Sequence, residues 1–164
     1  MSLYYFDLIR AMTKYCSTMG TSTVRIKTPE KSQVIAGRSD GQWPVVFQRK
    51  KGDGNVVVNV IRTDDAGAET SVLKLFLVDG GKITVCLSKG KYRINTAVGA
   101  TYYGSEEFFG ENGIYMRDEE HIYEVPSNEA RSITVGKLRG ETLSFTEYMT
   151  GQFSDPSLID KSSF

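Results

Sequence analysis

Hydrophobic and polar residues alternate along most of the chain with the period of two that is typical of half-buried β-strands. In the clearest case, the stretch 90–98, one face of an extended backbone carries Tyr92, Ile94, Thr96 and Val98. The longest β-branched run, residues 55–62, is typical of a central strand. Aspartate followed by two glycines at residues 79–81 separates two apolar runs, which predicts a hairpin.

These criteria predict about nine short strands, separated by turns rich in glycine, proline, asparagine and aspartate. So many short strands with a single helix candidate favour an antiparallel arrangement over alternating β-α units. We therefore predict an all-β fold, an antiparallel β-sandwich of the jelly-roll or Greek-key kind. The expected strands cover residues 21–27, 44–48, 55–62, 71–78, 82–87, 90–98, 121–125, 131–135 and 141–145.

The two ends of the chain depart from this pattern. Between residues 4 and 16 the apolar side chains recur at the spacing of one helical face, which predicts a short amphipathic helix that ends at Gly20. This helix would pack on the domain or dock on a partner. From Gly151 onward the polar composition predicts a flexible tail. The expected organisation is a helical segment at 1–20, with a vector remnant at its start, a β-sandwich domain at 21–150 and a tail at 151–164.

Charge argues against a nucleic-acid partner, and hydropathy argues against a membrane span. The chain has 20 lysine and arginine residues against 20 aspartate and glutamate residues. Nucleic acids and anionic lipids are usually bound through clustered positive charge, so we expect no nucleic-acid partner. No stretch reaches the roughly 18 consecutive apolar residues of a membrane-spanning helix, and the start lacks a secretory signal pattern. We expect no membrane span, and composition leaves the cellular location open.

Residues with catalytic potential form no familiar motif. The single histidine, His121, follows the acidic run 118–120, but adjacent residues of a strand or turn point in different directions and seldom bind one metal ion. Glu106 and Glu107 offer the carboxylate pair that a glycoside hydrolase uses. Cys16 and Cys86 lack metal or redox spacing, and a bridge between them depends on the fold. We expect no catalytic residue, metal or cofactor.

The aromatic residues are the best candidates for binding, because exposed rings stack on sugars or anchor protein contacts. In an extended segment the two members of an adjacent pair face opposite ways, so one ring of each pair is expected near the surface. Core packing is the alternative for each ring. Trp43 belongs to the same group of aromatic candidates. The predicted binding surface consists of Tyr102, Tyr103, Glu106, Glu107, Phe108, Phe109, Tyr115 and Tyr123.

Residues 90–104 carry the pattern G-x-Y-x-I-x-x-A-x-G-x-x-Y-Y-G, followed by phenylalanine and glycine at 109–110. This pattern resembles one in uncharacterised small bacterial proteins with a β-sandwich domain, often attached to the cell envelope. Its start is also similar to the turn of transthyretin-like sandwiches of the carboxypeptidase regulatory type. The match covers about residues 83–115. The resemblance implies a non-catalytic, extracytoplasmic module, and it brings no established ligand or active residue.

The sequence thus predicts a non-catalytic module that binds a protein or other ligand. One alternative is a carbohydrate-binding module, or a small glycoside hydrolase acting through Glu106 or Glu107. The other is a structural domain whose edge strands pair with neighbouring molecules. The sequence does not predict the oligomeric state.

Overall fold

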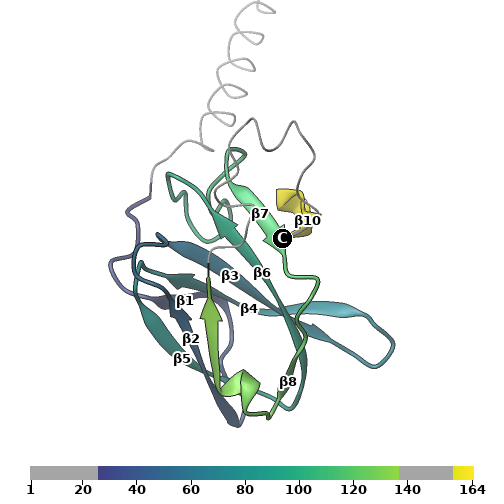
Figure 1. Ribbon diagram of the computed structural model, residues 1–164. Helices are drawn as coiled ribbons and strands as arrows, with labels where there is room; N and C mark the ends of the chain where they lie inside the picture. The colour runs from purple at the N-terminus through teal and green to yellow at the C-terminus, as the bar shows by residue number, and fades with distance from the viewer. Residues whose placement is uncertain (1–25, 137–156) are drawn as a thin grey trace, which may run out of the picture.

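The computed structural model describes residues 26–136 and 157–164 (Figure 1). Within these ranges the chain forms ten β-strands in two sheets and no α-helix. The all-β prediction is therefore confirmed. The helix predicted between residues 4 and 16 and the strand predicted at 141–145 lie outside the described residues, as does most of the strand predicted at 21–27.

The larger sheet has the strand order β1-β4-β3-β6-β7-β10, and β8 also pairs with β6. All of its pairings are antiparallel. β3 and β6 lie at its centre, as their apolar patterns predict. The strands are β1 (Gln33–Gly37), β3 (Val56–Thr63), β4 (Glu69–Leu77), β6 (Gly90–Val98), β7 (Ile114–Arg117), β8 (Tyr123–Val125) and β10 (Ser157–Leu158).

The smaller sheet has the order β5-β2-β9, formed by β5 (Lys82–Leu87), β2 (Trp43–Arg49) and β9 (Ser132–Val135). β2 is antiparallel to β5 and parallel to β9. β9 pairs only with residues 46–49, in parallel, so the start of β2 extends beyond the start of β9. This offset creates the groove described in the next section.

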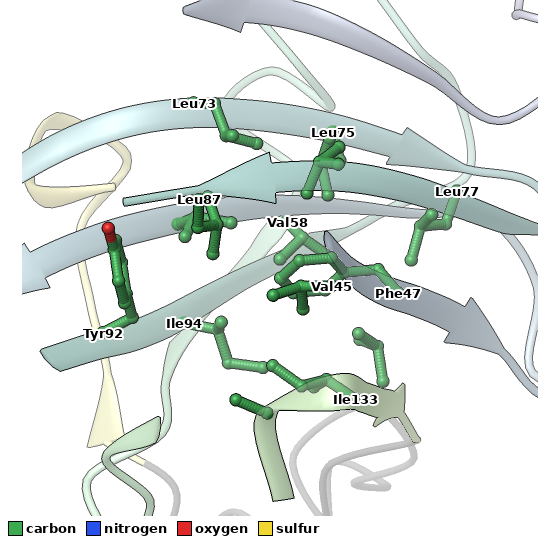
Figure 2. Packing of buried hydrophobic residues seen from close by; sticks show 14 of the residues in the cluster. Val45, Phe47, Val58, Leu73, Leu75, Leu77, Leu87, Tyr92, Ile94 and Ile133 are labelled. Atoms are coloured by element: carbon green, nitrogen blue, oxygen red, sulfur yellow. The ribbon is translucent and has the colours of Figure 1, made fainter. Parts of the chain in front are cut away.

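Side chains of both sheets pack into one hydrophobic core (Figure 2). Along β3 every second residue, Val56, Val58 and Val60, belongs to this core. Leu73, Leu75 and Leu77 of β4 follow the same alternation. Opposite them, β2 contributes Val45 and Phe47, and the Phe47 side chain is fully buried. The period of two in the sequence thus separates the residues that face the other sheet from those that face away.

The turn at residues 79–81 does not form the predicted hairpin. β4 and β5, which it connects, belong to different sheets. Both strands carry an apolar face, and they bury these faces in the shared core instead of pairing side by side. The Asp79 carboxylate holds the turn against the connection from β2 to β3 by accepting hydrogen bonds from the Gly52 and Gly54 N–H groups, at 2.7 and 2.9 Å.

A second hydrophobic cluster covers the other face of the larger sheet. Val57, Phe76 and Ala97 point to this face from β3, β4 and β6. The segment 99–113 and residues 159–164 pack over them. Of the tail predicted at 151–164, residues 151–156 lie outside the described residues. In the described part, β10 pairs with β7, the 3₁₀ turn η4 (Lys161–Ser163) follows, and Phe164 is only 8% exposed.

Candidate functional site

A groove of about 700 Å³ opens beside the first residues of β2, which lie before the start of β9. Pockets of roughly 300–1,000 Å³ are typical of small-ligand and side-chain binding sites. One wall is the first half of β2, and the other is the connection from β8 to β9, which includes the 3₁₀ turn η2 (Glu129–Arg131). The lining residues are Trp43, Pro44, Val45, Val46, Val125, Pro126, Ser127, Asn128, Ala130 and Arg131.

The connection 125–131 is held in place by its buried residues. Val125 and Ala130 are almost completely buried and belong to the core between the sheets. The Ser127 hydroxyl accepts a hydrogen bond from the Ala130 N–H at 3.1 Å, and the Val125–Pro126 peptide bond is cis. Because both ends of this wall are anchored in the core, the groove is a fixed feature of the fold.

Trp43 is the residue that gives the groove its binding potential. It is the only tryptophan in the chain and its side chain is 42% exposed. Pro44 and Pro126 add apolar surface, while Asn128 and Arg131 place exposed polar groups in the lining. Among the described residues, no aspartate, glutamate, histidine or cysteine lines the groove. Apolar surface with a few polar groups is the usual lining of a ligand-binding site.

A second hollow of about 530 Å³ adjoins the groove and shares Val125 and Pro126 with it. Its lining is rich in charged residues, and its three cationic side chains are balanced by three acidic ones. It therefore does not favour a ligand of either charge. The charged residues are Arg62, Lys89, Lys91, Asp64, Asp65 and Glu124.

Four of the rings predicted to bind are core residues. Tyr102, Phe108, Phe109 and Tyr115 are only 4–5% exposed and belong to the second hydrophobic cluster. The reason is a tight turn that folds the loop back on itself. The Tyr103 N–H donates to the Phe108 carbonyl at 2.7 Å, and the Phe108 N–H donates to the Gly104 carbonyl at 2.8 Å. For these four rings the alternative of core packing is correct.

The remaining predicted residues do not gather into one surface. Tyr103 is half-buried and Glu106 is exposed on the loop, whereas half-buried Tyr123 packs against the core between the sheets. The Tyr123 ring stacks on His121, with centroids 6.2 Å apart. Of the eight residues, four thus lie in the second cluster and Tyr123 packs against the core on the other face of the larger sheet, while the other three belong to neither cluster.

Glu107 and His121, which were considered for catalysis and metal binding, each contact an oppositely charged or hydrogen-bonding side chain. Glu107 forms an ion pair with Lys161, and its hydrogen bond raises the pKa of that lysine. His121 lies beside Asp118, with Nδ1 and Oδ2 separated by 3.0 Å. Within residues 26–136 and 157–164, no three histidine, cysteine, aspartate or glutamate side chains are grouped as metal ligands. Cys86 is a half-buried free thiol, and Cys16 lies outside the described residues.

The described part of the chain contains no helix with the length and apolar character needed to cross a bilayer.

We predict that stability falls as pH rises above about 10, the unperturbed pKa of tyrosine. Burial raises the pKa of Tyr92, Tyr102, Tyr115 and Tyr123, so the folded state retains phenolic protons that the unfolded chain releases. Burial lowers the pKa of Lys74, which acts in the opposite sense, but the raised pKa of Lys161 acts in the same sense as the four tyrosines. The measurement is urea denaturation between about pH 9 and pH 11.

The Tyr102→Phe variant is the control, because it keeps the ring and removes one titrating hydroxyl. Its free energy of unfolding should fall less steeply with pH than that of the wild type. A stability that stays constant or rises across this pH interval would contradict the prediction.

A scan against protein-family models, a search of curated proteins and a search of solved structures each found no match for this chain. The resemblance of residues 83–115 to envelope proteins therefore stays a prediction, and function is inferred from the geometry of the groove.

Proposed function

We propose that the chain is a non-catalytic binding module, built as a β-sandwich, that binds a segment of another protein in the groove beside Trp43. The observation that supports it is the position of Trp43, 42% exposed at a groove of about 700 Å³. An exposed tryptophan leaves a large apolar ring in water, and tryptophan is enriched among the residues that dominate the binding energy of protein interfaces. The two proline rings and Val46 extend this apolar surface.

The lining favours a ligand with an apolar or aromatic side chain next to a polar backbone. Such a side chain would fill the space between Trp43 and Pro126, while Arg131 would donate hydrogen bonds to a carbonyl or carboxylate of the ligand. Asn128 supplies both a donor and an acceptor. This combination of an apolar anchor and adjustable polar contacts is common in sites that bind peptides.

A glycan is the second candidate, supported by the same tryptophan. A sugar ring would stack on Trp43, and the side chains of Ser127, Asn128 and Arg131 would hydrogen-bond to its hydroxyl groups. Hydrolysis by Glu106 or Glu107 has less support, because Glu107 is ion-paired with Lys161 and neither glutamate lines the groove. An extracytoplasmic location belongs to the proposal through the sequence resemblance alone.

The test is a thermal-shift screen against oligosaccharides, proline-containing peptides and acidic peptides, followed by affinity measurements on variants. A ligand that binds the folded state raises the melting temperature by mass action. Trp43→Ala should weaken binding of any such ligand at least about tenfold while the melting temperature of the free protein hardly changes.

Ile122→Ala is the matched control, because Ile122 is 48% exposed and lies outside the groove lining. It should leave affinity unchanged. Equal loss of affinity in both variants, or none in Trp43→Ala, would refute the groove as the binding site. The class of the ligands that bind separates the peptide proposal from the glycan alternative.

A further inference from the structure

Residues 157–164 are seated on the larger sheet in the manner of a bound peptide. β10 pairs antiparallel with the edge strand β7, with Ser157 opposite Arg117 and Leu158 opposite Met116. The Ile159 N–H continues this pairing by donating to the Tyr115 carbonyl at 3.0 Å. In the sequence, the twenty residues 137–156 separate β9 and the following Gly136 from this segment.

Phe164 anchors the far end of the segment in the second hydrophobic cluster. Its ring meets those of Phe108 and Tyr115 edge to face, with centroids 5.1 and 5.3 Å apart. The Asn59 side-chain amide donates a hydrogen bond to the Phe164 carbonyl. Edge-to-face ring pairs of this kind contribute beyond the burial of their area, so Phe164 is the main apolar anchor of the segment.

A charge pair fixes the segment between these two contacts. Lys161 pairs with Glu107 of the loop that covers the sheet, and Glu111 lies 3.8 Å from the same ammonium group. The segment thus has a strand contact, a charge contact and an aromatic contact, all with residues at least 40 positions away in the chain. Each of these contacts would form equally well if the segment came from another molecule.

We propose that residues 157–164 are exchanged between copies of this chain, so that the segment of each molecule occupies the β7 site of a second molecule. The twenty residues 137–156 span up to about 70 Å when extended, which is enough to reach a neighbouring molecule. Exchange of an identical element is a low-cost route to dimers because the contacts are the same in the closed and exchanged forms.

The shortness of the β10–β7 pairing also favours exchange. β10 has two residues, so the pairing that protects this sheet edge is brief, and exposed edges are where strands of other molecules add. A connection of this length gives the segment an effective concentration on the order of millimolar at the β7 site of its own molecule. The fraction of exchanged dimers therefore rises as the protein concentration approaches that range.

The test uses two full-length charge-reversal variants, Glu107→Lys and Lys161→Glu. Alone, each variant places like charges at the site, in both the closed and the exchanged form. In a mixed exchanged dimer both sites carry opposite charges: one pairs the introduced lysine with the introduced glutamate, and the other restores the wild-type pair. We expect the equimolar mixture, incubated near millimolar concentration, to contain at least about ten times more dimer than either variant alone, measured by native mass spectrometry.

The double variant Glu107→Lys/Lys161→Glu is the control, because it restores opposite charges within one chain. It should behave as the wild type does, which also shows that the reversed charges are compatible with folding. A mixture that contains no more mixed dimer than the separate variants contain dimer would overturn the proposal. Because Trp43 is not involved, this outcome is independent of the test of the groove.

Discussion

Phe47→Ala is expected to lower the free energy of unfolding by about 3–5 kcal/mol. Phe47 lies in the middle of β2 and its side chain is fully buried in the core between the sheets. The substitution removes the ring and leaves a cavity bounded by side chains of both sheets, which cannot collapse without moving a strand. β2 pairs with β5 and β9, so such a movement would disturb the whole smaller sheet.

Urea denaturation followed by circular dichroism measures this effect. Trp43→Ala in the same strand is the control, because Trp43 is 42% exposed and its loss should cost no more than about 1 kcal/mol. If the two variants lose equal stability, Phe47 is not at the centre of a shared core. If Phe47→Ala is too unstable to purify, Phe47→Leu takes its place. It should still lose more stability than Trp43→Ala, although less than Phe47→Ala would.

Gly37→Ala is expected to cost about 1–3 kcal/mol more than Gly67→Ala. The two glycines have nearly the same positive φ, +80° and +84°, so alanine meets the same left-handed backbone penalty at both positions. They differ in their surroundings. A Cβ at Gly37 would lie 2.2 Å from the Val72 carbonyl oxygen, whereas at Gly67 nothing lies within 4 Å.

The difference between the two variants therefore measures the close approach of β1 to β4, where Gly37 pairs with Leu73. Both are compared by chemical denaturation under the same conditions. Equal losses would mean that β1 does not pack against β4 as described. A loss confined to Gly37→Ala would mean that the left-handed conformation of Gly67 is not maintained.

Seven of the ten described strands were predicted, because the information for a strand is largely local, whereas β1, β7 and β10 were missed. The β-branched residues 55–62 and the alternation at 90–98 became β3 and β6, the central strands of the larger sheet. Alternation records which residues face a core, but not which strand lies alongside. This is why the turn at Asp79 predicted a hairpin, while the structure sends β4 and β5 into different sheets.

The candidate site was mostly beyond sequence reasoning, for the same reason. The groove exists because β9 pairs with residues 46–49 and leaves the start of β2 uncovered, which depends on a register set by distant contacts. The rings of Tyr102 and Phe108 did indicate a structural feature, but that feature is the second hydrophobic cluster under the loop and not a binding surface. A lone tryptophan next to proline at 43–44 was the one local hint of the groove.

The fluorescence of Trp43 is the most direct test of the groove as the binding site. As the only tryptophan in the chain, it reports on this groove without background from another indole. When a ligand selected by the thermal-shift screen is added, the emission should shift to shorter wavelength with the same midpoint as the binding curve, because the ring leaves water. Tyr103→Ala should not alter that midpoint. Saturable binding that leaves Trp43 emission unchanged, or that is lost in Tyr103→Ala, would place the ligand elsewhere and contradict the proposal.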